Sequence, residues 1–431
     1  MTAKAPREHD ATIQDSPTPL IGRRALLFGL AATAGLTQRG SANDVLSSHL
    51  PPATTDIVPF KVDVPQAAID GLRRRLEMTR WPERELVSDW SQGLPLERIQ
   101  SLVEYWRKSH DWRRAEAAIN TFPQYRMRID GLGIHFLHIR SRHADALPMV
   151  LTHGWPGSVF EFLKVIGPLT DPTSHGGRPN DAFHLVIPSL PGFGFSDKPV
   201  TRGWGLPRVA SAWTELMMRL GYSHWVAQGG DWGSGVTTWL AAQHARGLAA
   251  VHINLPVMFP PPLQGELADV EKPALEMLRT FALEKSGYAR LQATRPQTIG
   301  YALTDSPAGQ AAWIYEKLAE WSQSGYDPES VLTRDAILDN ISLYWFTATA
   351  ASSARLYAES FYTDFSARKL DIPVGVTIFP GENFRPPRLW GERLYSRLFY
   401  WNDAQRGGHF AAFEQPGIFV DEMRACFALV R

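Results

Sequence analysis

The clearest chemical signal in this sequence is the segment Gly229–Gly233, which reads GGDWG. It follows an apolar run, His224–Gln228, that is typical of a strand, and it precedes a helix expected at Ser234–His244. A residue flanked by glycines in such a strained strand-to-helix turn projects its side chain above the end of a sheet. Here that residue is Asp231, whose carboxylate can attack an electrophilic carbon and form a covalent ester. The alternative is a glycine-rich turn in which Asp231 only caps the helix.

A second segment, His153–Ser158 (HGWPGS), follows the apolar run Met149–Thr152. In the α/β-hydrolase fold, an earlier loop and the residue after the nucleophile each supply a backbone N–H group to an oxyanion hole. The corresponding N–H groups here belong to Trp155 and Trp232. The alternative is an ordinary loop of glycine and proline.

A base and an acid follow the nucleophile in the chain order of α/β-hydrolases. Gly407–Phe410 places His409 in a glycine-rich loop after the last expected strand, where a general base must lie. Glu382 follows the expected strand Val374–Phe379, at the end where parallel sheets carry functional groups. Its predicted role is to orient His409 and stabilise its cation. Asp403 is the next candidate for the acid.

The elements that must position these residues alternate between strands and helices. Short apolar runs predict strands at Tyr125–Ile129, Ile134–Ile139, Met149–Thr152, His184–Ile187, Trp225–Gln228, Val251–Leu255, Val374–Phe379 and Leu398–Tyr400. Helical patterns lie between several of them, at Phe160–Leu169 and Pro207–Leu220. This alternation predicts an α/β-hydrolase fold, with a mostly parallel sheet and helices on both faces.

The alternation stops between Leu255 and Pro373, where the sequence is rich in Trp and Tyr and mostly helical in pattern. Helices are expected there at Pro273–Leu283, Gly309–Trp321 and Thr333–Tyr344. We interpret this stretch as a lid inserted between late strands of the core. The N-terminal part has a short strand pattern at Ile57–Val64 and helical patterns at Gln66–Thr79, Leu96–Arg107 and Trp112–Asn120, but no catalytic signal. The predicted organisation is an export signal at 1–42, an N-terminal segment at 43–122, the first part of the core at 123–257, the lid at 258–370 and the second part of the core at 371–431.

Residues 1–42 resemble a bacterial twin-arginine export signal. Arg23 and Arg24 precede the apolar run Ala25–Leu36, which is shorter than the ~20 residues that a membrane-spanning helix needs. Gly40–Ala42 offers small residues for cleavage. The prediction is a periplasmic or extracellular protein that meets the membrane only during export or through an uncleaved segment. A chance arginine pair in an extension would instead leave the protein cytoplasmic.

Composition excludes several classes of protein. Lys+Arg and Asp+Glu both number 44 among 431 residues, so the balanced charge argues against a nucleic-acid partner. With 44% hydrophobic and 20% charged residues, the chain has ample material for a core. The single cysteine, Cys426, rules out an intramolecular disulfide and a cysteine-based zinc cluster.

These motifs together resemble those of microsomal-type epoxide hydrolases, a branch of the α/β-hydrolase superfamily with an extra N-terminal segment. The resemblance runs from about Ile57 to the C-terminus. The matching stretches are 79–82 (TRWP), 153–158 (HGWPGS), 191–196 (PGFGFS), 229–234 (GGDWGS), 294–307 and 407–410 (GGHF). The resemblance implies an enzyme that converts an apolar epoxide and water to a vicinal diol without a cofactor or metal. It leaves the oligomeric state open.

The resemblance also implies two lid tyrosines that hold the epoxide oxygen. They match Tyr288 and Tyr357, and Tyr344 and Tyr362 lie near the second position. A phenol with a pKa near 10 can donate a hydrogen bond to the alkoxide that forms on ring opening and can protonate it.

The implied mechanism has two steps. Asp231 attacks a ring carbon and forms an ester, and water activated by His409 and Glu382 then hydrolyses that ester.

Two other functions remain open from the sequence. A haloalkane dehalogenase would use the same aspartate nucleophile, but it binds halide through side-chain N–H groups of Trp or Asn instead of a tyrosine pair. A non-catalytic binding module on the same fold is the other alternative, since a fold does not determine function.

Overall fold

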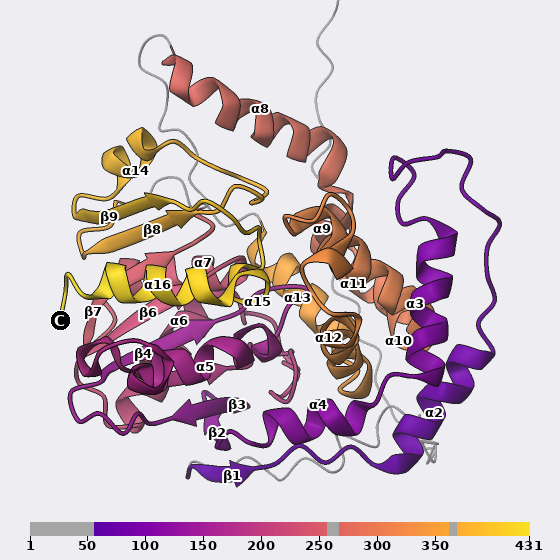
Figure 1. Ribbon diagram of the computed structural model, residues 1–431, viewed down its shortest axis with the longest axis horizontal. Helices are drawn as coiled ribbons and strands as arrows, with labels where there is room; N and C mark the ends of the chain where they lie inside the picture. The colour runs from indigo at the N-terminus through magenta and orange to yellow at the C-terminus, as the bar shows by residue number, and fades with distance from the viewer. Residues whose placement is uncertain (1–55, 257–266, 362–368) are drawn as a thin grey trace, which may run out of the picture. The chain divides into compact units, whose positions relative to one another are not determined.

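The computed structural model describes residues 56–256, 267–361 and 369–431. Within these ranges a nine-stranded sheet has the order β1-β2-β3-β5-β4-β6-β7-β8-β9 (Figure 1). The strands are β1 (Val58–Phe60), β2 (Gln124–Ile129), β3 (Leu132–Ile139), β4 (Leu147–Thr152), β5 (Phe183–Pro188), β6 (Trp225–Gly229), β7 (Leu248–Ile253), β8 (Val374–Ile378) and β9 (Leu398–Asp403). Neighbours from β5 to β9 are parallel, whereas β1, β2 and β3 pair antiparallel. The predicted α/β-hydrolase sheet is confirmed.

The parallel strands are apolar because helices cover both faces of the sheet. All residues of β6 and of β8 are buried. On one face α5 (Leu163–Thr170) packs against α16 (Pro416–Phe427), and both lie in front of the sheet in Figure 1. On the other, α6 (Leu206–Arg219) packs against α7 (Trp232–Ala242), which also contacts β4, β6 and β7.

The order of the strands determines where a site can form. The chain leaves β4 for β5 on one side, and it then crosses to β6 on the other side of β4. Ligands of open α/β sheets bind at such a switch point, outside the carboxyl ends of the strands. The loop 153–158 follows β4 and the turn around Asp231 follows β6, so both lie at this point.

A helical insertion separates β7 from β8. It contains η4 (Asp269–Glu271), α8 (Lys272–Thr280), the π-helical turn η5 (Phe281–Lys285), α9 (Gly287–Thr294), α10 (Pro296–Asp305), α11 (Pro307–Trp321), η6 (Pro328–Ser330), α12 (Arg334–Phe346) and α13 (Ala350–Ser360). In Figure 1 the orange helices α11 to α13 lie beyond the ends toward which β8 and β9 point. The insertion therefore stands over the carboxyl edge of the parallel strands.

The N-terminal segment joins the sheet and the insertion. Its strand β1 pairs with β2, and its helices are α2 (Gln66–Glu77), α3 (Leu96–Lys108) and α4 (Trp112–Ile119). The Trp106 indole donates a hydrogen bond of 2.9 Å to the Ser342 hydroxyl of α12. His110 Nε2 lies 2.8 Å from Asp339 Oδ1 of the same helix. These buried contacts hold α12 against the N-terminal segment.

The structure departs from the expected elements in several places. The strand expected at Ile57–Val64 spans only three residues, and the helix expected at Phe160–Leu169 is divided into η1 (Val159–Phe162) and α5. Several helices were not anticipated from the sequence. They are α9, α10, α13, α14 (Arg388–Leu394), α15 (Ala411–Glu414) and α16. Small or polar residues fill much of α13, which is buried by packing on α9 and α10 and carries a weak apolar pattern.

The remaining elements are the short turns η2 (Pro172–His175) and η3 (Pro179–Asp181). The predicted export signal at 1–42 and Tyr362 fall outside the described residues. Among the helices that are described, none combines the length and the apolar character needed to span a bilayer.

Candidate active site

Asp231 occupies the turn between β6 and α7 with a backbone strained into a positive φ of 50°. The neighbouring glycines make this turn possible. A Cβ atom at Gly229 would lie 2.1 Å from the Gly233 carbonyl oxygen, and one at Gly233 would lie 1.9 Å from the Thr152 carbonyl oxygen. Because only glycine fits at both positions, the chain can turn tightly and present the Asp231 carboxylate above the sheet.

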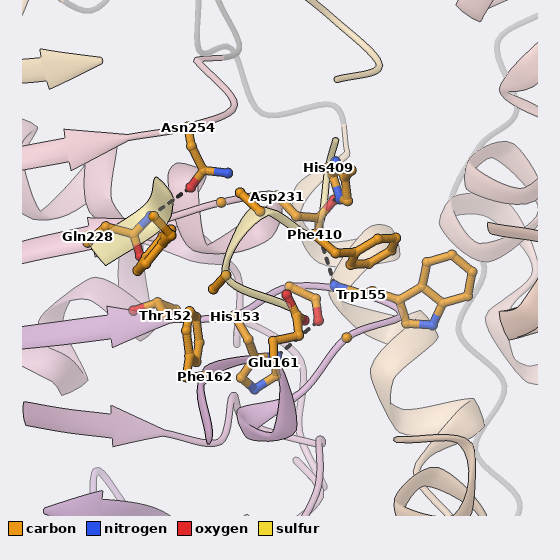
Figure 2. A pocket seen from close by; sticks show the side chains of 16 residues that line it. Thr152, His153, Trp155, Glu161, Phe162, Gln228, Asp231, Asn254, His409 and Phe410 are labelled. Carbon is orange, nitrogen blue, oxygen red and sulfur yellow. Dashed lines mark hydrogen bonds and ion pairs between the residues drawn. The ribbon is translucent and has the colours of Figure 1, made fainter. Parts of the chain in front are cut away.

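One oxygen of this carboxylate is bound by the loop after β4. The Trp155 amide donates a hydrogen bond of 2.8 Å to Asp231 Oδ1, drawn as a dashed line in Figure 2. Gly154 allows this approach, since a Cβ atom there would lie 2.0 Å from Oδ1. The predicted partner amide, that of Trp232, begins α7 directly after Asp231. Within the described part of the chain, only the first of these two amides is bonded to the carboxylate.

The other oxygen of Asp231 faces His409. His409 Nε2 lies 3.3 Å from Asp231 Oδ2, and His409 Nδ1 lies 2.7 Å from Glu382 Oε1. Glu382 is deeply buried, and the same Oε1 accepts a 2.7 Å hydrogen bond from the Asn383 amide. The imidazole is thus placed between two carboxylates from different loops.

These charges determine the protonation of His409. Burial lowers the pKa of the imidazole, but the Glu382 carboxylate and then Asp231 oppose it, and the net pKa lies well above the usual value. Alkylation of Asp231 would remove one of these negative charges. The pKa of His409 would then fall, so that the ring could lose its proton and, as a neutral imidazole, accept another.

The two predicted tyrosines meet over the same site. The ring centroids of Tyr288 (α9) and Tyr357 (α13) lie 5.9 Å apart. Tyr288 stacks on the Trp155 ring at 5.4 Å, and Tyr357 meets the Trp232 ring edge-to-face at 4.7 Å. Burial, followed by the Asp231 charge for Tyr288, raises the pKa of each phenol well above 10. Both therefore remain protonated hydrogen-bond donors at neutral pH.

The structure separates these residues from the alternatives. The Tyr344 hydroxyl donates a 2.8 Å hydrogen bond to the Gly157 carbonyl, so it is already used within the fold. Asp403 is exposed at the end of β9, whereas Glu382 is the carboxylate against His409 Nδ1. The seven residues predicted for the site are therefore brought together, and their roles remain predictions.

Other groups that the sequence did not single out line the same cavity. They include Glu161, Gln228 and Asn254 (Figure 2). Gln228 Nε2 donates a hydrogen bond of 2.6 Å to Asn254 Oδ1 next to the turn that carries Asp231. Trp321, at the end of α11, packs on the rings of His409 and Tyr288 at 5.0 Å and 5.1 Å. The sequence signal for Glu161 was a lone acid in the apolar run Val159–Leu163.

Comparison with known proteins places this geometry in a family. The family model for the epoxide hydrolase N terminus matches residues 57–162, and that for the alpha/beta hydrolase fold matches residues 148–283. A protein of Stigmatella aurantiaca (strain DW4/3-1) named "Putative epoxide hydrolase" is 59% identical over 100% of this chain and 98% of its own. Epoxide hydrolase 1 of Sus scrofa is 34% identical over 87% of this chain and 89% of its own.

A solved structure agrees with these sequence matches. The epoxide hydrolase of Aspergillus niger is 33% identical, covers 88% of this chain and 98% of its own, and superposes with a TM-score of 0.78. The chain therefore belongs to the epoxide hydrolase family with the α/β-hydrolase fold.

Proposed function

We propose that this enzyme opens an apolar epoxide through a covalent ester on Asp231 and then hydrolyses that ester to release a vicinal diol. The observation that carries the proposal is the arrangement around one carboxylate. Asp231 Oδ1 is bound by the Trp155 amide, Oδ2 faces His409, and the phenols of Tyr288 and Tyr357 lie over the same site.

The first step alkylates Asp231. Oδ2 attacks a ring carbon of the epoxide and the carbon–oxygen bond of the ring breaks, leaving its electron pair on the epoxide oxygen. Tyr288 and Tyr357 hydrogen-bond to this oxygen and supply a proton. The proton that the tyrosines lose is replaced by the protonated His409, whose pKa falls as Asp231 loses its charge.

The second step hydrolyses the ester. His409, now neutral, takes a proton from a water molecule, and the water oxygen bonds to Cγ of Asp231. The carbonyl electron pair moves to Oδ1, which the Trp155 amide stabilises. The bond from Cγ to the ester oxygen then breaks, and the remaining water proton passes to the diol. Asp231 and the protonated His409 are restored, and the nucleophile keeps the oxygen of water.

The surroundings favour an apolar substrate, and we propose that the helical insertion acts as its lid. The rings of Trp155 and Trp321 frame the tyrosine pair. A depression of about 350 Å³, mostly lined by apolar surface, extends from Trp321 to Met277 and Phe281 of the insertion. Burial of an apolar substituent there would contribute to binding through the hydrophobic effect.

The proposal is tested with the full-length His409→Gln variant and styrene oxide as the probe. The variant should form the ester but fail to hydrolyse it, so intact mass should rise by the whole mass of styrene oxide, and peptide mapping should locate the adduct on Asp231. The Asp231→Asn variant is the matched control and should gain no mass. A single turnover of the parent enzyme in ¹⁸O-labelled water should place the label in Asp231.

Other outcomes would contradict the proposal. Label that enters the diol directly in a single turnover would show that water attacks the epoxide without an ester. The His409→Gln variant is also exposed to 1-bromobutane in a separate reaction. An adduct that forms only with this compound, with loss of bromide, would indicate a dehalogenase.

A further inference from the structure

Glu161 is a buried acid that has no role in the two proposed chemical steps. It belongs to η1 (Val159–Phe162), directly after the loop that binds Asp231, and it lines the cavity together with Asp231 and His409. Figure 2 shows its side chain pointing up from the ribbon of η1 toward the nucleophile. Although Glu161 lies deep in the protein, it keeps an intermediate accessible surface, as expected for a side chain that borders a cavity.

The loop after β4 is shaped around this carboxyl. A Cβ atom at Gly157 would lie 1.4 Å from Glu161 Oε1, so the carboxyl occupies the space that any other side chain would need. The backbone of Ser158 also lies near it and lowers the pKa of the carboxyl. Gly154 has the same relation to Asp231, with a Cβ position 2.0 Å from Oδ1. Two glycines of one loop therefore each accommodate a carboxyl group at the site.

Burial keeps Glu161 neutral. Burial raises its pKa to about 8, with His409 lowering it and the carboxylates of Asp231 and Glu414 raising it. At neutral pH the group is therefore a carboxylic acid, which can stand close to Asp231 without the repulsion of a second negative charge. A protonated carboxyl keeps the capacity to accept hydrogen bonds at its carbonyl oxygen.

The cavity between these groups has the size of one water molecule. Its volume is about 20 Å³, and a polar cavity of roughly 10–15 Å³ or more can hold a water when two or more partners are available. His409 offers one such partner on its Nε2 side, and Glu161 offers another from the floor of the cavity.

We propose that Glu161 binds the hydrolytic water and orients it for attack on the ester at Asp231. This inference rests on the proposed function. One hydrogen of the water points to His409 Nε2 and leaves as the proton that the base accepts. The other points to the Glu161 carbonyl oxygen and stays on the water oxygen as it bonds to Cγ. With both hydrogens held, the lone pair of the water oxygen is directed at Cγ.

The test separates the two chemical steps in Glu161→Met and Glu161→Gln, using rapid-quench measurement of ester and diol with styrene oxide. The Met variant keeps the volume of the side chain but loses the acceptor. It should slow ester hydrolysis about 10- to 100-fold, since a misplaced reacting group costs up to roughly 10²-fold, and it should leave alkylation near the parent rate. Gln mimics the neutral carboxyl and should restore most of the hydrolysis rate.

Two further variants distinguish water binding from a structural effect. Gly157→Ala adds a Cβ atom where the carboxyl lies, so it should reproduce the hydrolysis defect of Glu161→Met while keeping Glu161 in the chain. Glu414→Gln removes a second acid near His409. The Glu414 carboxylate accepts hydrogen bonds from the backbone N–H groups of Gln323 and Phe410, at 2.8 Å and 3.0 Å, so its role is structural. Glu414→Gln should lower thermal stability without a selective loss of hydrolysis.

The proposal is overturned if Glu161→Met slows both steps equally, if it slows neither, or if Gln is as impaired as Met. The His409→Gln variant shows separately whether the proposed covalent mechanism itself is wrong. If His409→Gln traps no ester on Asp231, the proposed function itself is wrong, whatever the Glu161 variants do. If His409→Gln traps the ester and Glu161→Met hydrolyses it normally, only the role of Glu161 is lost.

Discussion

His409 Nδ1 lies 2.7 Å from Glu382 Oε1, and the two side chains are only 3% and 0% exposed. A charged pair this deeply enclosed is scarcely screened by solvent or salt. The carboxylate thus fixes the ring orientation with Nε2 toward Asp231. In the proposed reaction it would also stabilise the imidazolium that forms during ester hydrolysis.

Replacing Glu382 by Gln keeps the shape but removes the charge. We expect ester hydrolysis to slow by up to about 10⁴-fold, in line with neutralisation of the acid in a catalytic triad, so that the ester accumulates in rapid-quench experiments. Asp403→Asn, at an exposed position of β9, is the matched control and should hydrolyse the ester normally. The opposite pattern, with Asp403 essential and Glu382 dispensable, would reassign the acid.

Removal of the hydroxyl groups of Tyr288 and Tyr357 should slow the alkylation step. Tyr288→Phe or Tyr357→Phe should slow alkylation about 10- to 100-fold, because the remaining phenol still donates one hydrogen bond. The double variant should lose the benefit of general acid catalysis, typically about 10²- to 10⁴-fold. Stopped-flow quenching of tryptophan fluorescence by the epoxide measures this step directly. Tyr301→Phe, an exposed tyrosine of α10, serves as control. Equal slowing of ester hydrolysis would argue against a role confined to ring opening.

Much of the site could be predicted because its signals are local in the chain. The glycines around Asp231 are required by a turn at the end of one strand, and His409 and Glu382 each follow a strand as well. Parallel strands bring such ends to one edge of the sheet, so residues far apart in sequence could be expected to meet there.

What could not be predicted depends on packing between elements. Tyr344 and Tyr357 have similar sequence surroundings, and only the position of the Gly157 carbonyl shows that the first is already hydrogen-bonded. Glu161 stands in an apolar run, and its significance depends on the cavity, on Gly157 and on the charge of His409. The sequence did not predict the helix α13, because its small side chains are buried by close contacts with other helices and show no strong periodicity of apolar residues.

Gly154 provides a steric test of the position of the Asp231 carboxylate. Gly154→Ala would place a Cβ atom 2.0 Å from Asp231 Oδ1 and so displace the carboxylate from the Trp155 amide. We expect alkylation to fall by about 10²-fold or more, as misplacement by an ångström can cost this much. The matched control is Gly417→Ala in α16, where a Cβ atom meets nothing within 4 Å. Full activity of Gly154→Ala would show that the loop moves away from Asp231 at little cost.

Buried histidines predict how stability depends on pH. His252 Nε2 lies 2.9 Å from the Thr377 hydroxyl oxygen, whose proton is donated to Glu422 at 2.6 Å, so Nε2 carries the ring proton. Nδ1 is buried without a hydrogen-bond partner among the described residues. Burial lowers the pKa of His252 from 6.5 to about 3, because a proton on Nδ1 would be an enclosed charge.

Since the folded pKa lies below the unfolded one, the unfolded chain binds the extra proton first as pH falls. Above pH 6.5 His252 is neutral in both states and causes no loss of stability. Between pH 6.5 and about 3 the protonation of His252 in the unfolded chain progressively lowers the free energy of unfolding. At pH 4.5 this amounts to about 2–3 kcal/mol, at roughly 1.4 kcal/mol per pH unit. His252→Gln should lower stability at pH 7.5 but flatten this acid slope in urea titrations, whereas His175→Gln at an exposed site should keep the parent slope. An unchanged slope in His252→Gln would mean that the buried imidazole is protonated in the folded enzyme.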